Sequence, residues 1–323
     1  MTERRKTIGG FFPLELPEGA EYHRQALRLN SARYALEYLL RVRNYQKIYL
    51  PAYLCDSVLQ PVKRLNIAYS FYSIGEDFAP IFDHIPEENA CFLYVNYFGV
   101  NAVNAAKICR RMKHVIIDNT QAFFTKPYAH IDTIYSPRKF FGVPDGGYLY
   151  TNAQKRLDLK QDVSDYRCDA LLKQVDLGDE AALPLYVENE AYLDHCGMLA
   201  MSCLTQRLLS GIDYHRVLVR RNENFRFLHE QIGRFNQLPI NLSELNGPMC
   251  YPFLITRGTQ LKEALLSRRI YVNDYWDEVL TRVSSGSFEH HLVKDLVPLP
   301  IDQHCNRADL QAMVQIIREF LTR

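Results

Sequence analysis

Between residues 30 and 150 the sequence alternates strand-like and helix-like segments, and this alternation constrains the fold more than any other feature. Residues 90–95 form a continuous apolar run, as expected for a strand that is buried on both faces. Residues 31–42 and 102–112 instead repeat apolar side chains at helical spacing. This order of elements predicts an α/β fold with a mainly parallel sheet sandwiched by helices.

The remaining segments complete a two-domain prediction. Further strands are predicted at 47–50, 67–72, 114–117, 133–135 and 148–150, and a further helix at 55–65. Residues 158–211 are mostly helical in pattern, and 214–235 predicts one long charged helix. After Pro239 we predict strands at 251–255 and 270–272 around a helix at 260–268, then a closing helix at 309–321.

A chain of 323 residues with 47% hydrophobic residues is long and apolar enough for a large core and a smaller appendage. We therefore predict a large α/β domain over residues 1–236, which includes an N-terminal arm, and a small α+β C-terminal domain over residues 237–323.

The charge balance argues against binding to nucleic acid. The 38 basic and 37 acidic residues leave a net charge of +1, and we interpret the one basic cluster, residues 4–6, as a solvated chain end. No apolar run approaches the roughly 20 residues that span a bilayer. Pro13 and Glu15 interrupt the first apolar cluster, which is unlike a signal peptide. We therefore expect no membrane partner and a cytoplasmic location.

The cysteines do not form a metal-binding pattern. There are eight, none in a C-x-x-C pair, and several lie in apolar runs such as residues 91–93. Buried reduced thiols are the better interpretation, and no metal site is expected.

Polar or turn-forming residues follow several predicted strands, at the positions where an α/β sheet places its ligands. These segments are 51–53, 96–99, 118–121 and 136–139. Ligands of open α/β sheets bind outside the carboxyl ends of the strands, so these segments need a functional explanation.

Three of these features match the needs of one cofactor. Asp118 ends an apolar strand, Lys139 follows the next strand, and Ser31 opens a helix. Taken singly they are an ordinary strand-end acid, a solvated lysine and a helix cap. Pyridoxal 5'-phosphate needs all three together: an amine for a Schiff base, a carboxylate beside its pyridine nitrogen, and an anion site for its phosphate.

Several segments also resemble a known enzyme family. Residues 30–36 (NSARYAL) resemble its S-G-T-x-A-L phosphate turn, 50–53 (LPAY) its P-x-x-aromatic segment, 117–122 (IDNTQA) its E-D-x-A-Q-A motif, and 139–147 (KFFGVPDGG) its lysine followed by E/D-G-G. Residues 8–12 and 299–301 are similar to its opening and its ending. The family is the DegT/DnrJ/EryC1/StrS group of fold-type I aminotransferases.

The resemblance implies a role for each matching residue. Lys139 would form the Schiff base and move the proton between substrate carbon and cofactor carbon, and Asp118 would hold the pyridinium N–H. Gln121 would contact the phenolic oxygen of the cofactor, and Tyr53 would stack on its ring.

The phosphate would be held by Ser31, Ala32 and Ser136. Two departures from the family pattern concern this group. Ser136 precedes Lys139 by only three residues, closer than in the family's S-F-x-x-x-K. Arg33 replaces the small residue of the phosphate turn, where it either pairs with the phosphate or faces outward.

The implied activity is transfer of an amino group from an amino acid such as glutamate to a nucleotide-linked keto-sugar or related keto substrate. The resemblance also implies a homodimer with active sites at or near the subunit interface. Two alternatives stay open: another reaction of the same cofactor, such as elimination or dehydration, and a non-catalytic relative acting as a regulator. Lys139 favours transamination, because dehydratase-like relatives carry histidine there.

A nucleotide-binding α/β enzyme has no support, since the sequence contains neither G-x-G-x-x-G nor G-x-x-x-x-G-K-[ST]. Trp276 either faces the substrate entrance or anchors the small domain. The segment Asp145-Gly146-Gly147 is interpreted as a structural tight turn. Arg216, Arg220 and Arg221 are expected on a solvated helix face.

Overall fold

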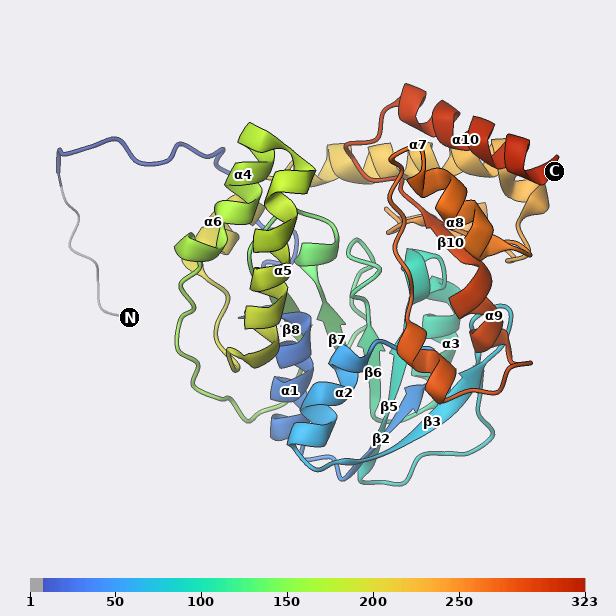
Figure 1. The fold of residues 1–323 in the computed structure, drawn as a ribbon. Helices are drawn as coiled ribbons and strands as arrows, with labels where there is room; N and C mark the ends of the chain where they lie inside the picture. The colour runs from blue at the N-terminus through green and yellow to red at the C-terminus, as the bar shows by residue number, and fades with distance from the viewer. Residues whose placement is uncertain (1–7, 323) are drawn as a thin grey trace.

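The apolar run at Ala90–Val95 forms a strand, β5, whose residues are all buried near the middle of an eight-stranded sheet in a computed structural model (Figure 1). The structure describes residues 8–322, so the basic cluster at residues 4–6 lies outside the described part of the chain. The sheet is strongly apolar through its centre, which is why its strands read as continuous hydrophobic runs in the sequence.

Five adjacent strands of the sheet, β7, β6, β5, β2 and β3, run parallel, and this confirms the predicted α/β class. Antiparallel strands pair at both ends of this block. In sheet order the strands are β1 (Leu27–Leu29), β8 (Gly147–Tyr150), β7 (Asp132–Tyr135), β6 (Val115–Asp118), β5 (Ala90–Val95), β2 (Lys47–Pro51), β3 (Ala68–Ile74) and β4 (Pro80–Ile81). The order reverses between β2 and β5, which makes their carboxyl ends a topological switch point.

Helix α1 (Ala32–Arg43) shows why the sequence forms these elements. Ser31 caps its first turn, Asn44 ends it in the left-handed conformation at a φ of 56°, and its apolar face is buried. The other helices are α2 (Asp56–Arg64), α3 (Ala102–Arg111), α4 (Asp169–Leu177), α5 (Asp179–His195), α6 (Cys203–Ser210), α7 (Tyr214–Ile232), α8 (Gly258–Leu266), α9 (Phe288–Asp295) and α10 (Arg307–Leu321). In residues 8–322 no helix is both long and apolar enough to cross a bilayer.

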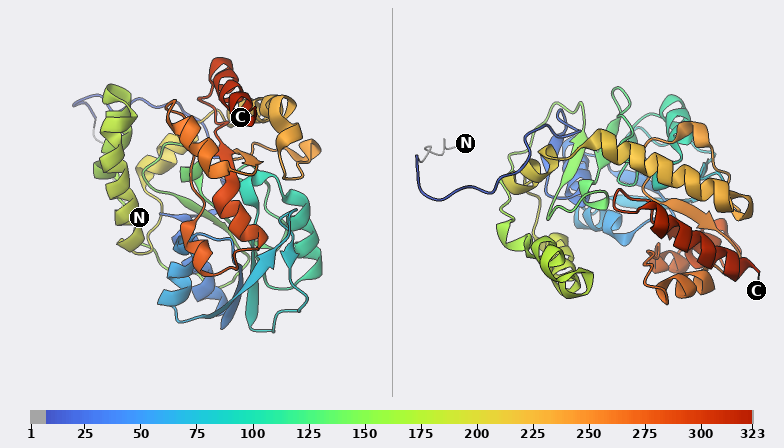
Figure 2. Two further views of the ribbon diagram at one scale, coloured as in Figure 1. Left: turned by 45° about the vertical axis from the view of Figure 1, so that its right-hand side comes forward. Right: turned by 90° about the horizontal axis from the view of Figure 1, so that it is seen from above.

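The C-terminal part contains a separate two-stranded antiparallel sheet of β9 (Tyr251–Leu254) and β10 (Leu296–Leu299). The strand predicted at 270–272 is wrong, because the amide of Ile270 donates to the carbonyl oxygen of Leu265 (3.0 Å) and closes the end of α8. Helix α7 packs beside α10 (Figure 2) and also against β9. The boundary at residue 236 stays a prediction.

Arg221 corrects a second expectation, since it is one of the largest fully buried side chains rather than part of a solvated face. Its guanidinium donates to the carbonyl oxygens of Pro248 and Met249 (3.1 Å each) and to Gln303 (3.1 Å). Burial lowers the pKa of Arg221 to about 10. Arg216 and Arg220 are exposed as predicted, so only the third arginine faces the interior.

Burial of His23 makes part of the stability dependent on pH. Its ring lies 4.1 Å from the ring of Tyr135, its Nε2 contacts the carbonyl oxygen of Phe123 (2.8 Å), and burial lowers its pKa from 6.5 to about 4. The folded chain therefore binds the proton less well than the unfolded chain, and stability present above pH 6.5 is lost as the pH falls towards 4.

We expect His23 to make the folded state about 2 kcal/mol less stable at pH 5 than at pH 7, by linkage. The His23→Gln variant should lose this part of the pH dependence, whereas a variant of the exposed His304, His304→Gln, should keep it. Urea unfolding at the two pH values measures the difference. An unchanged pH dependence in His23→Gln would contradict the assignment.

Candidate active site

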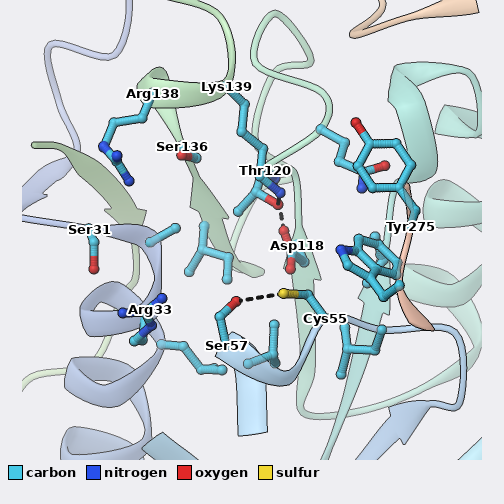
Figure 3. Close-up of a pocket in the computed structure, with 18 of the residues that line it drawn as sticks. Ser31, Arg33, Cys55, Ser57, Asp118, Thr120, Ser136, Arg138, Lys139 and Tyr275 are labelled. Atoms are coloured by element: carbon cyan, nitrogen blue, oxygen red, sulfur yellow. Dashed lines mark hydrogen bonds between the residues drawn. The ribbon is translucent and has the colours of Figure 1, made fainter. Parts of the chain in front are cut away.

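A cavity of about 280 Å³ opens at the carboxyl ends of β5, β6 and β7, next to the loop that follows β2 (Figure 3). This position is the switch point of the sheet, where open α/β folds bind their ligands. Its volume is near the lower limit of small-molecule sites, roughly 300 Å³. The cavity brings together six residues predicted from the sequence: Ser31, Ala32, Asp118, Gln121, Ser136 and Lys139.

The start of α1 forms one side of the cavity. Ser31 Oγ accepts a hydrogen bond from the amide of Tyr34 (3.3 Å), and Ala32 is the first helical residue. Amides in the first turn have no partner inside a helix, and the helix dipole adds positive potential there. This end of α1 is therefore suited to an anion.

Two glycines allow the neighbouring strand to approach this turn. A Cβ on Gly147 would lie 2.3 Å from the backbone carbon of Ser31, and Gly146 has a φ of +130°. The amide of Gly146 donates to the carbonyl oxygen of Asn30 (2.7 Å). Gly146 and Gly147 thus have a structural role, since they fix residues 30–32 against β8.

Asp118 lies on the opposite side of the cavity from Ser31, at the end of β6 (Figure 3). Its side chain is buried, and Oδ1 accepts a hydrogen bond from the amide of Thr120 (2.8 Å). Burial raises the pKa of Asp118, while the positive charge of Lys139 and the bonds from Thr120 lower it. A buried carboxylate of this kind is stabilised by a cationic N–H partner in the cavity.

Lys139 ends the short turn Pro137–Lys139 and reaches the cavity beside Asp118. Its Nζ donates to Thr120 Oγ1 (3.2 Å), so Thr120 contacts both functional groups. The side chain of Lys139 is exposed in the single chain. The amine end of the site is consequently open to solvent while the carboxylate end is buried.

Gln121 and Ser136 also line the cavity. Gln121 Oε1 accepts a hydrogen bond from the amide of Phe98 (2.7 Å), so its carboxamide nitrogen is the end that a ligand would contact. Ser136 follows β7 and is buried at the cavity wall.

Tyr53 is not among the residues that line the cavity, and its stacking on the cofactor ring stays a prediction. The side chain is fully buried, with ring centroids 5.6 Å from Tyr97 and 5.0 Å from Trp276. The hydroxyl of Tyr97 donates to the carbonyl oxygen of Tyr53 (2.7 Å) and fixes the backbone there. The next residues, Leu54 and Cys55, line the cavity in its place.

The cavity also contains residues that the sequence analysis did not single out: Cys55, Ser57, Thr120, Arg138, Glu190 and Tyr275. Thr120 lies inside the recognised segment 117–122 and Arg138 is adjacent to Lys139, so their positions in the sequence could have predicted that they line the cavity. No sequence pattern around Glu190, on α5, predicts its place at the cavity. Trp276 lines the cavity and also packs on Tyr53, so both of its interpretations stay open.

Arg33 and Arg138 lie on the same side of the cavity as Ser31 (Figure 3). Arg33 pairs with Asp194 and Arg138 pairs with Glu190, both acids on α5. Arg33 therefore faces the cavity, which excludes the interpretation that it points outward.

Comparison with known proteins identifies solved structures that share this fold. No protein-family model and no curated protein matches the sequence. Among solved structures, a DegT DnrJ EryC1 StrS aminotransferase from Brucella abortus aligns over 91% of this chain and 85% of its own, at 15% identity and a TM-score of 0.58. The sugar aminotransferase CalS13 from Micromonospora echinospora covers 91% and 87%, at 12% identity and a TM-score of 0.64.

Helicobacter pylori PseC, an aminotransferase involved in the biosynthesis of pseudoaminic acid, covers 92% and 87%, at 15% identity and a TM-score of 0.60. The chain has the fold of these aminotransferases. This agrees with the fold expected from the resemblance of the sequence segments.

Proposed function

We propose that the chain is a pyridoxal-phosphate-dependent aminotransferase that transfers an amino group from an amino acid such as glutamate to a keto-sugar, nucleotide-linked or related. One observation carries the proposal: Lys139, Asp118 and the start of α1 come from three distant segments and meet in one cavity. A shared fold alone would not support an activity, because function depends on the site.

The residues of the cavity fit the cofactor. Asp118 offers a buried carboxylate for a pyridinium N–H, and Lys139 offers an amine for the aldehyde. At the far side, Ser31, Ala32 and Ser136 would hold the phosphate. Bound there, the cofactor would supply an electron sink for the negative charge left when the substrate loses its α-proton.

The chemistry assigned to the chain's own residues follows from these positions. The carboxylate of Asp118 would keep the pyridine nitrogen protonated through a charge-assisted hydrogen bond. Lys139 Nζ would take the proton from the substrate carbon and return it to the cofactor carbon. Thr120 Oγ1, 3.2 Å from Nζ, would hold the amine near this path.

The substrate class rests on the sugar aminotransferases that share the fold and on the sequence resemblance. It is tested by loading the chain with cofactor and supplying glutamate or glutamine with a panel of nucleotide-linked keto-sugars. We expect an amino-sugar product and one equivalent of keto acid from the donor. A deoxygenated sugar formed without consumption of the donor would instead establish elimination.

We further propose that the chain works as a homodimer, the commonest closed oligomer. Helices α4 and α5 carry large apolar side chains that are more than half exposed: Leu172, Val175, Leu177, Leu183, Tyr186 and Val187. Patches of this kind mark interaction surfaces. A second copy would also help to cover the open amine end of the site.

Val175 is 84% exposed, so Val175→Asp should leave the fold of a single chain intact and disrupt an interface that includes α4. We expect light scattering at micromolar concentration to give twice the chain mass for the parent and a shift towards the single-chain mass for the variant. Arg220→Asp, on the exposed face of α7, should remain dimeric. A parent protein that is monomeric with full cofactor occupancy would contradict the shared site.

A further inference from the structure

Two arginines at the cavity are held by acids from a single helix. Arg33 pairs with Asp194, and its Nη1 donates to the carbonyl oxygen of Leu193 (3.0 Å). Arg138 pairs with Glu190, one helical turn earlier on α5. Positions four apart lie on the same helix face, so α5 presents both carboxylates to the two guanidinium groups together.

The burial of the two partners differs in a way that points into the cavity. The arginine side chains are 14% and 15% exposed, whereas Asp194 and Glu190 are 37% and 40% exposed. The guanidinium groups are thus the inner members of each pair. The Nε atoms of both arginines are buried and have no hydrogen-bond partner among the described residues.

An unsatisfied buried donor is costly, and here two belong to residues that line the same cavity. Guanidinium groups present five donors each in a planar fork that matches the oxygens of a phosphate. A phosphate monoester such as the cofactor's, and the diphosphate of a nucleotide-linked sugar, each carry two negative charges and several acceptor oxygens, so one such group could engage both arginines. Glu190 accepts from both terminal nitrogens of Arg138, yet the two carboxylates still leave the buried Nε donors of both arginines without a partner among the described residues.

We propose that Arg33 and Arg138 form a clamp for a phosphate-ester dianion, and that the incoming phosphate displaces Glu190 and Asp194 from them. Binding therefore releases α5 from this side of the cavity. The inference deepens the proposed function, since the phosphate would belong either to the cofactor or to a nucleotide-linked substrate. In this account the two carboxylates on α5 compete with phosphate for Arg33 and Arg138.

The competing explanation is that the two ion pairs only attach α5 to the body of the protein. In that case the affinity for phosphate would not depend on Glu190 and Asp194, and α5 would keep its contacts when phosphate binds. The two explanations predict different effects of neutralising the acids on phosphate binding. Removing the competitors tightens phosphate binding if the clamp exists, and leaves it unchanged if the pairs are only structural.

The first experiment measures the affinity of the cofactor-free full chain for inorganic phosphate by calorimetry. We expect the double variant Glu190→Gln with Asp194→Asn to bind phosphate roughly tenfold more tightly, and Arg33→Gln with Arg138→Gln to bind it at least roughly tenfold less tightly. Matched controls are Glu188→Gln on the exposed face of α5 and Arg220→Gln on α7. Acid and arginine variants that both match the parent would overturn the clamp.

The second experiment separates the two sources of phosphate. If the cofactor's phosphate is clamped, the arginine variants lose affinity for pyridoxal phosphate but not for pyridoxal. If the substrate's phosphate is clamped, they lose affinity for a nucleoside diphosphate added to the cofactor-loaded chain. Either loss supports the clamp, and the absence of both overturns it.

The third experiment follows α5 directly by amide hydrogen exchange of Asp179–His195. We expect phosphate to accelerate exchange in this helix in the parent, and to have little effect in the acid double variant. Unchanged or slower exchange in the parent would overturn the displacement. A negative hydrogen-exchange result would contradict only the displacement of α5. The proposed enzyme activity is tested separately, because a cofactor bond to Lys139 is detected by its own absorption band.

Discussion

The Lys139→Ala variant is expected to lose amino transfer by at least roughly a thousandfold, equivalent to about 4 kcal/mol of barrier. Lys139 is the only lysine among the described residues that line the cavity, so no second amine is placed to move the proton. Its side chain is exposed and its one hydrogen bond is to Thr120, so its loss should hardly affect folding. Single-turnover conversion of the loaded chain by glutamate measures the rate.

Lys126→Ala is the matched control, because Lys126 is exposed and lies outside the cavity. This variant should convert at the parent rate. Parent-like conversion by Lys139→Ala would show that another group carries the proton and would remove Lys139 from the site.

The Asp118→Asn variant should separate binding from catalysis. Asparagine has nearly the same shape and can still contact the pyridine nitrogen, but it carries no charge to keep that nitrogen protonated. Cofactor binding through Lys139 and the start of α1 should largely survive. We expect the single-turnover rate to fall by roughly a hundredfold or more, equivalent to about 3 kcal/mol.

Asp158→Asn, at an exposed position, controls for the loss of one negative charge. If Asp118→Asn binds cofactor and converts it at the parent rate, Asp118 is a structural strand end and its assigned role is wrong. If the variant fails to bind cofactor at all, the carboxylate is needed for binding itself, which would contradict the separation.

The parts of the site that the sequence predicted are those with a local cause. Ser31 begins a helix whose apolar spacing is evident, and Asp118 ends a strand that is apolar throughout. Lys139 follows the next strand within a short turn. Because parallel strands align their carboxyl ends, these local positions were enough to predict that the three residues meet.

Features that depend on distant contacts were not predictable. The orientation of the Tyr53 ring is set by Tyr97 and by Trp276, which lies far along the chain. Glu190 reaches the cavity only because α5 packs beside it. Strand β10 was not predicted because it forms by pairing with β9, which lies far earlier in the chain.

The central claim is that Lys139 holds the cofactor, and it is tested most directly by trapping the bond. The purified chain is incubated with pyridoxal phosphate, reduced with borohydride, digested and analysed by mass spectrometry. The account predicts an absorption band before reduction and a stable cofactor adduct on the peptide containing Lys139. A chain that stays colourless with added cofactor, or an adduct confined to other lysines, would contradict it.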